Sequence, residues 1–241
     1  KAVERIEQFN DDHPLFAWVS FGGPHFPFDA PAEYYKRVDM EQDPGRKVFE
    51  GEFDDPGRIH NKSYHGDGNI EGCSMAPGKA CKNYSEEYWT DLRKNYFANV
   101  ALIDDEVGKI LNAIQNKFGD NVLIIFTADH GEMLGNHSLW GKHNCGYDDV
   151  WNIPMLVKYP NQKEGIESDA KVMLTDILPT CLKAAGLVPI ESDGMDFKEN
   201  MERGGYRYVF AEGEGYIAVS DGSVKYIRVL KKGEDYRELI D

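Results

Sequence analysis

One short segment combines an apolar run with two acidic residues, three histidines and a lysine: residues 124–143, IIFTADHGEMLGNHSLWGKH. Asp129 and His130 supply a carboxylate oxygen and an imidazole nitrogen, and both groups bind divalent metals. Lys142 adds a cation that can hold an anion, and His143 could extend the same anion pocket. The pattern therefore predicts half of a divalent-metal site beside an anion site. The alternative is a solvated loop in which Asp129 only caps the turn and His130 packs.

Two other histidines also have to be assigned, one outside this segment and one within it. His25 stands between two prolines in GGPHFP (22–27), where it can donate a proton to a substrate oxygen or contact it; a partly buried loop histidine is the alternative. His137 is predicted to be structural. Its spacing from His130 is not that of HExxH, which excludes a zinc-protease site. The sequence also has no GxSxG elbow and no glycine-rich phosphate loop before a helix.

Three apolar runs predict the strands that position these residues. They are PLFAWVSF (14–21), NVLIIF (121–126) and IPMLVKY (153–159), and unbroken apolar runs are typical of strands buried on both faces. Between the first two runs, apolar residues recur every three or four positions, which predicts a long helix. We expect Ser85 to cap that helix and Gly119 to end it. The first two strands would then form a βαβ unit in a parallel sheet.

The predicted strands place the reactive residues at their ends. His25 follows the first run, and Asp129 and His130 follow the second. In open α/β sheets, ligands bind outside the carboxyl ends of parallel strands. We therefore expect His25, Asp129, His130 and Lys142 to converge on one pocket at one edge of the sheet.

The pattern of the chain changes near its end. Residues 1–203 indicate one α/β domain, interrupted at 40–84 by a polar, irregular insertion without a usable period. Residues 204–241 alternate between apolar and polar and predict a small antiparallel subdomain. Asp221 and Gly222 are expected to form the tight turn of a hairpin within it.

Composition limits the classes of partner. The chain has 241 residues and a formal net charge of −15, which argues against nucleic acid or an anionic membrane as a partner. No apolar run is long enough to cross a membrane. The chain begins KAVERIEQF, without Met, and we interpret it as a piece of a longer protein. Four cysteines show no CxxC spacing; Cys73 and Cys81 could form a disulfide or be two unrelated thiols.

Taken together, these segments resemble the sulfatase family of the alkaline phosphatase superfamily. The likeness is greatest to the iduronate-sulfatase and bacterial polysaccharide-sulfatase branches, and it covers most of the chain in the family's order. The segment TADHGEMLGNHSLWGKH resembles the family's C-terminal metal-and-anion motif, and WVSFGGPHFPFDAPAEYY its strand and PHxP segment. Four other segments resemble, in turn, the family's long helix, the strand after it, the next helix and the usual tail. They are YFANVALIDDEVGKILNAI, NIPMLVKYP, LTDILPTCLKAAGL and YRELID.

The resemblance implies a fold and a set of roles. The fold is α/β, part of an alkaline-phosphatase-like sheet flanked by helices, with the small antiparallel subdomain at its C-terminal end. Asp129 and His130 correspond to metal ligands, normally for one calcium ion. Lys142 corresponds to the lysine that contacts the sulfate, and His25 to the histidine near the bridging oxygen; both are expected to bind substrate and act in catalysis. His143 is expected to add to substrate binding.

The chain departs from the family at the nucleophile. The family uses a cysteine or serine in C/S-x-P-x-R, matured to formylglycine and upstream of the PHxP segment, and this chain has no such motif. CSMAP (73–77) lacks the arginine and follows His25 instead of preceding it. The amino-terminal aspartate pair that completes the metal site is also missing. We therefore expect the missing N-terminal portion of the same protein to be a partner, and this chain alone to be inactive with an incomplete calcium site.

The expected reaction is cleavage of a sulfate monoester, small or carbohydrate, to alcohol and sulfate, with a sulfated carbohydrate as the expected substrate. A secreted, periplasmic or lysosome-like location is expected as well. Two alternatives stay open. One is a phosphonate monoester or phosphodiester hydrolase of the same superfamily. The other is a noncatalytic sheet domain that retains a vestigial metal edge.

Overall fold

The computed structural model describes residues 1–10, 12–55, 64–65, 81–142, 146–213, 216–230 and 236–240. The chain divides into two compact units, and each is described by itself. The first unit comprises Lys1–Lys47 and Asn83–Val122, and the second comprises Val48–Lys82 and Leu123–Asp241. Among the described residues, no helix is both long enough and apolar enough to cross a membrane.

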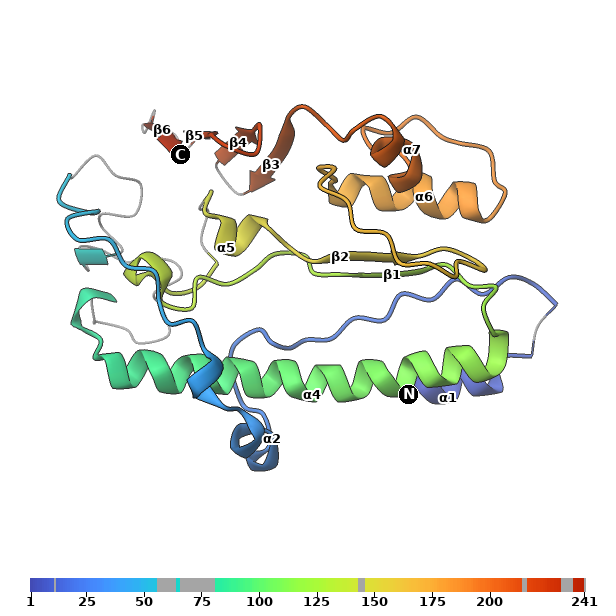
Figure 1. Cartoon of the computed structure of the whole chain (residues 1–241), viewed down its shortest axis with the longest axis horizontal. Coiled ribbons are helices and arrows are strands. Elements are labelled where there is room, and N and C mark those ends of the chain that lie inside the picture. Colours follow the sequence, from blue (N-terminus) through green and yellow to red (C-terminus); the bar gives the residue numbers. More distant parts are fainter. Residues whose placement is uncertain are drawn as a thin grey trace. The chain divides into compact units, whose positions relative to one another are not determined.

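The first unit is built on the long helix α4 (Glu86–Phe118), drawn in green in Figure 1. As predicted, Ser85 caps it, accepting a hydrogen bond from the backbone N–H of Tyr88 at 3.2 Å. Gly119 ends it with φ of 60°, a conformation that favours glycine. Helix α1 (Ala2–Gln8) lies along α4 (Figure 1), where the rings of Phe9 and Phe118 are 6.0 Å apart.

Polar contacts attach the rest of the first unit to α4. Helix α2 (Ala32–Arg37) packs on α4, and Arg37 donates to the carboxylate of Asp105 at 2.7 Å. The short 3₁₀ helix η1 (Met40–Gln42) follows α2. Next to it, Nε of Arg93 donates to Asp43 at 2.7 Å, and the two side chains are only 7% and 8% exposed. This buried ion pair holds the beginning of the 40–84 insertion against α4.

The prediction of a doubly buried strand at residues 14–21 is wrong. The segment forms no strand, and its apolar side chains are exposed, with Phe16 at 75% and Trp18 at 73%. A strand needs a neighbour for its backbone N–H and C=O groups, and no strand in the described part of the chain pairs with this segment. The predicted βαβ unit is therefore absent from the described residues.

The second unit opens with a two-stranded sheet. Strand β1 (Ile124–Thr127) pairs with β2 (Met155–Lys158), which confirms strands in the second and third apolar runs. The pairing is antiparallel rather than part of a parallel sheet. Phe126 lies opposite Leu156, and both are exposed, at 43% and 60%. One face of this sheet is therefore apolar but uncovered by the described residues.

A buried carboxylate organises the segment after β2. The 3₁₀ helix η4 (Leu174–Asp176) leads into α6 (Ile177–Ala184), and α7 (Phe197–Glu202) follows. Asp176 is fully buried and accepts hydrogen bonds from Tyr206 Oη at 2.6 Å and from the backbone N–H of Met195 at 2.8 Å. These donors replace the water that the carboxylate loses on burial.

The C-terminal region confirms the prediction of antiparallel structure. Strands β3 (Val209–Gly213), β4 (Tyr216–Ser220), β5 (Lys225–Val229) and β6 (Tyr236–Ile240) form a four-stranded antiparallel sheet in chain order. The turn between β4 and β5 lies at Asp221 and Gly222, as predicted. Asp221 accepts from the N–H groups of Val224 and Ser223, and these bonds lower the pKa of its carboxyl.

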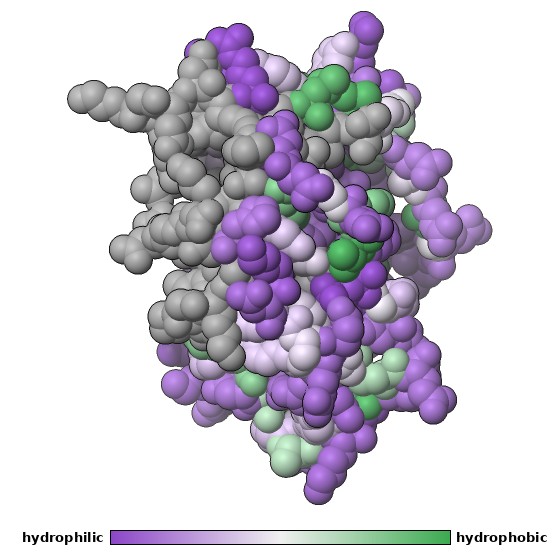
Figure 2. All heavy atoms as spheres, turned by 90° about the vertical axis from the view of Figure 1, so that its left-hand side faces the viewer, coloured by the Kyte–Doolittle hydropathy of each residue, from purple (hydrophilic) through white to green (hydrophobic). Residues whose placement is uncertain are grey.

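The insertion at 40–84 remains mostly irregular where it is described. It contains η1 and, at its far end, the 3₁₀ helix η2 (Cys81–Asn83). Cys73, the possible partner of Cys81, lies outside the described residues. On the face drawn in Figure 2, the described side chains are mainly hydrophilic and the apolar ones stand in small separate groups.

Candidate active site

The predicted metal pair stands directly after β1. Asp129 Oδ1 accepts the backbone N–H of His130 at 3.0 Å, and Asp129 Oδ2 lies 3.6 Å from Nε2 of the same imidazole. Nδ1 of His130 is 2.9 Å from the carbonyl oxygen of Gly131. A carbonyl only accepts, so Nδ1 carries a proton. In the neutral ring, Nε2 therefore keeps its lone pair on the side of the Asp129 carboxylate.

This arrangement fits two ligands of one divalent cation. Oxygen ligands stand about 2.3–2.6 Å from calcium, so two donors at roughly a right angle would be separated by about 3.5 Å, close to the observed gap. The bond from Nδ1 of His130 to a backbone carbonyl is the kind of contact that orients a metal-binding imidazole. The Asp129 side chain is 86% exposed and accessible to an ion. Within the described ranges, however, no group of three or more His, Cys, Asp or Glu side chains could hold a metal.

Gly131 explains how the chain turns after this pair. Its backbone N–H donates to the carbonyl of Val150 at 2.9 Å, and the N–H of Glu132 donates to the carbonyl of Asp149 at 3.0 Å. A Cβ on Gly131 would lie 1.9 Å from that Asp149 oxygen. Only glycine can pass so close to helix α5 (Asp148–Trp151). The contact fixes where the chain leaves His130.

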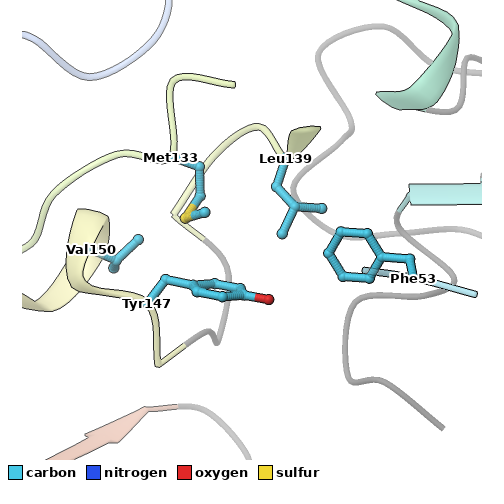
Figure 3. Close-up of a cluster of buried hydrophobic side chains, with 5 residues drawn as sticks. All are labelled: Phe53, Met133, Leu139, Tyr147 and Val150. Carbon is cyan, nitrogen blue, oxygen red and sulfur yellow. The ribbon is translucent and has the colours of Figure 1, made fainter. Parts of the chain in front are cut away.

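Residues 131–142, which we call the anion loop, fold over a small apolar core. Met133 and Leu139 are fully buried against Phe53, Tyr147 and Val150. Figure 3 shows these five side chains converging, with Phe53 reaching in from the insertion.

The same loop is closed by hydrogen bonds within its own backbone. The N–H of Met133 donates to the carbonyl of Gly141 at 3.0 Å, and the N–H of Gly135 to that of Leu139 at 2.9 Å. The 3₁₀ turn η3 (Asn136–Ser138) forms its tip. Lys142 follows the closing bond and is partly buried, so the loop fixes the backbone from which it extends.

His25 lies in the first unit, beside a cavity of about 450 Å³. Asp29, Asn99 and Glu106 give this cavity its polar lining, and Leu102 is among the apolar side chains. His25 is exposed, and its Nδ1 lies 2.6 Å from the carbonyl oxygen of Phe26. Nδ1 is therefore a donor, and Nε2 is the nitrogen left for a substrate.

The structure thus brings some of the predicted site residues together. Asp129 and His130 adjoin each other, and Lys142 lies in the same unit at the end of the anion loop. His25 belongs to the other unit, so its convergence with them stays a prediction. His143 lies outside the described residues.

One set of contacts near the site was missed by the sequence reasoning. Nδ1 of His137 lies 2.8 Å from Glu52 Oε1, and Tyr147 Oη donates to the same oxygen at 2.9 Å. The nearest signal in the sequence is the position of His137 within the anion loop. Nothing in the insertion marks Glu52, because that segment has no periodicity.

Known proteins resemble most of this chain. The Sulfatase family model matches residues 1–187. The uncharacterized sulfatase YidJ of Escherichia coli K12 is 30% identical over 189 residues, which are 78% of this chain and 35% of that protein. An N-acetylglucosamine-6-O-sulfatase of Bacteroides thetaiotaomicron is 34% identical over 116 residues, 46% of this chain and 20% of that protein. Human iduronate 2-sulfatase is 26% identical over 171 residues, 67% of this chain and 30% of that protein.

Solved structures show the same fold. A putative sulfatase of Bacteroides thetaiotaomicron aligns with TM-score 0.73 and 19% identity over 100% of this chain and 54% of its own. The phosphonate monoester hydrolase of Agrobacterium radiobacter aligns with TM-score 0.73 and 22% identity over 99% of this chain and 52% of its own. The fold is α/β and corresponds to part of an alkaline-phosphatase-like fold. The chain belongs to the sulfatase family. It spans about a third or less of the length of the curated relatives named above.

Proposed function

We propose that this chain is the C-terminal part of an enzyme that hydrolyses sulfate monoesters to an alcohol and sulfate. The observation that carries the proposal is the Asp129–His130 pair, whose carboxylate and imidazole Nε2 face each other after β1. The pair stands in a chain whose residues 1–187 match the Sulfatase family. The anion loop that follows ends in Lys142, the cation the reaction needs.

The chemistry assigns a role to each residue. Cleavage of a sulfate ester develops negative charge on the nonbridging oxygens and on the departing alcohol oxygen. Lys142 would neutralise charge on the nonbridging oxygens, and His143 would donate a further hydrogen bond to the sulfate. His25, when protonated, would transfer a proton from Nε2 to the bridging oxygen as the S–O bond breaks. A calcium ion held by Asp129 and His130 would act as a Lewis acid toward the sulfate oxygens.

The missing N-terminal portion of the same protein would complete the site. We expect it to carry a C/S-x-P-x-R motif matured to formylglycine, together with the remaining metal ligands. Two apolar surfaces support an additional segment of chain: the exposed run around Phe16 and Trp18, and the face of Phe126 and Leu156 on β1 and β2. Exposed apolar surfaces of this kind ordinarily mark places where another segment or partner packs.

A sulfated carbohydrate is the proposed substrate. Two of the relatives named above are sulfatases whose names specify sugar units, N-acetylglucosamine and iduronate. The net charge of −15 also agrees with a substrate held by a few local cations rather than by a basic surface. Sulfated polysaccharides are too large to enter cells readily, so the proposed location is secreted, periplasmic or lysosome-like.

The test is turnover by the full-length protein with an aryl sulfate and, in parallel, an aryl phosphonate monoester. We expect the sulfate to be the better substrate, and Lys142→Ala to lower kcat/KM by about 10²–10³-fold, as for loss of one oxyanion-stabilising group. Lys163→Ala removes an exposed lysine and serves as the matched control. Equal kcat/KM values for Lys142→Ala and Lys163→Ala would show that Lys142 has no role in the reaction. If the unmodified protein prefers the phosphonate, the phosphonate monoester hydrolase alternative is favoured. If it hydrolyses neither substrate, the noncatalytic alternative is favoured.

Calcium binding by this chain alone gives a second test. Calcium takes six to eight oxygen ligands, and the described residues offer one carboxylate and one imidazole at this position. We therefore expect calorimetry to show a Kd in the range of about 10⁻⁴–10⁻³ M or weaker. Asp129→Asn should abolish the binding, and Asp169→Asn, a change at an exposed carboxylate, should leave it unchanged. Micromolar affinity would show that this chain completes the site by itself.

A further inference from the structure

The anion loop carries an imidazole that the mechanism does not use. Nδ1 of His137 lies 2.8 and 3.0 Å from the two carboxylate oxygens of Glu52, and Nε2 lies 4.0 Å from Asp149 Oδ2. Its ring stacks on Tyr147, with centroids 4.0 Å apart, and faces Phe49 at 5.3 Å. The His137 side chain is 16% exposed and that of Glu52 is 9% exposed. An imidazole between two carboxylates and two rings is held on every side.

The backbone around His137 needs such support. Leu134, His137 and Ser138 adopt φ values of 47°, 54° and 53°, the left-handed region that residues other than glycine rarely adopt. Residues held there persist only where the surrounding contacts over-determine the conformation. His137 is the one of the three that bears an ionisable side chain, and its contact with Glu52 joins the tip of the loop to another part of the chain.

Glu52 is itself fixed in place. Tyr147 Oη donates to it at 2.9 Å, and its neighbour Phe53 is buried in the core beneath the anion loop (Figure 3). On the other side of the ring, Asn136 donates from its side-chain amide to Asp149. The insertion and helix α5 therefore hold the tip of the loop from two directions.

We propose that Glu52 and His137 form a clamp that positions Lys142, and this rests on the proposed function of Lys142 as the sulfate-binding cation. The route is short. His137 fixes the turn, the turn places Leu139 in the core, and the bond from the N–H of Met133 to the carbonyl of Gly141 closes the loop immediately before Lys142. Glu52 and His137 act through Lys142 and touch no substrate, so they are positioning residues.

The test is the change Glu52→Gln in the full-length enzyme, assayed with an aryl sulfate. The amide keeps the size of the side chain but removes the charge that faces His137. We expect kcat/KM to fall by about 10–100-fold, the same order as the effect of losing a residue that orients a metal ligand. Glu50→Gln is the matched control, because Glu50 is an exposed acidic residue of the same segment. A fall of equal size in both variants would overturn the clamp.

A double-mutant cycle separates positioning from general stability. If Glu52 acts through Lys142, Glu52→Gln should change kcat/KM less than about twofold in a Lys142→Ala background, since coupled residues are not additive. Full additivity of the two changes would overturn the proposal. Tyr147→Phe, which removes only the hydroxyl donor to Glu52, is a second variant and should show the same non-additivity.

Amide exchange in this chain distinguishes failure of the clamp from failure of the proposed function. Glu52→Gln should speed exchange at Met133 and Gly135 by about tenfold or more, whereas Glu50→Gln should not. Unchanged exchange overturns the clamp whatever the activity. Faster exchange together with a wild-type enzyme that turns over no sulfate supports the clamp and contradicts the proposed function.

Discussion

Tyr206 offers a direct measure of how much a buried carboxylate contributes to the fold. Its hydroxyl donates to Asp176 at 2.6 Å, and Asp176 is fully buried. The carboxylate also accepts the N–H groups of Met173 at 2.9 Å and Met195 at 2.8 Å. Burial and the hydrogen bond to Asp176 raise the pKa of Tyr206 above its ordinary value, so the hydroxyl remains a donor across neutral pH.

The change Tyr206→Phe removes one hydrogen bond to a charged acceptor and leaves the ring in place. Such bonds contribute about 1.5–3 kcal/mol. Because two backbone N–H groups and the side-chain amide of Asn200 still donate to Asp176, we expect a loss near the middle of this range, about 2 kcal/mol in the free energy of unfolding. The loss should exceed that of an ordinary neutral hydrogen bond, which is about 1 kcal/mol.

Urea denaturation followed by circular dichroism measures this loss as a shift in midpoint at constant slope. Tyr208→Phe is the matched control, since Tyr208 is 44% exposed and stands two residues away. We expect the control to change stability by less than about 0.5 kcal/mol. If Tyr206→Phe costs no more than the control, the Asp176 network does not stabilise the chain as argued.

Two further predictions concern other contacts. Arg93 lowers the pKa of Asp43 mainly through its hydrogen bonds, so this pair should stabilise the fold fully above the unfolded pKa of about 3.9 and progressively less as pH falls through the lower folded value. Asp43→Asn should therefore cost about 3 kcal/mol at pH 7 and flatten the acid limb of a stability–pH curve; an unchanged limb would contradict this. Gly131→Ala should cost about 2 kcal/mol or more, because its Cβ would lie 1.9 Å from the Asp149 oxygen, whereas Gly165→Ala, which meets nothing within 4 Å, should be close to neutral in thermal unfolding.

Local sequence signals predicted the elements that depend on local interactions. Helix α4 was predicted with its cap because Ser85 and the apolar stripe act within a few residues of one another. The β4–β5 hairpin was predicted because Asp221 and Gly222 supply the turn by themselves. In both elements, the residues that specify the structure lie within the element or directly next to it in the sequence.

The sheet could not be predicted in the same way. An apolar run such as residues 14–21 records only that a segment is suited to burial, and not which strand lies beside it. In the described residues this run has no paired strand, and β1 pairs antiparallel with β2. Strand direction depends on which segments meet in space, and the periodicity of a single run does not encode that.

The candidate site shows the same division between local and distant information. Asp129 and His130 are consecutive, so their residue types alone were enough to predict a metal pair. Glu52 reaches His137 across 85 residues of sequence, from an insertion with no periodicity. Such a contact depends only on the distance between the carboxylate and the imidazole in the folded chain, so no sequence pattern in the loop marks the residue that makes it. The residue types of the proposed metal pair could therefore be recognised in the sequence, whereas the contact between Glu52 and the loop became visible only in three dimensions.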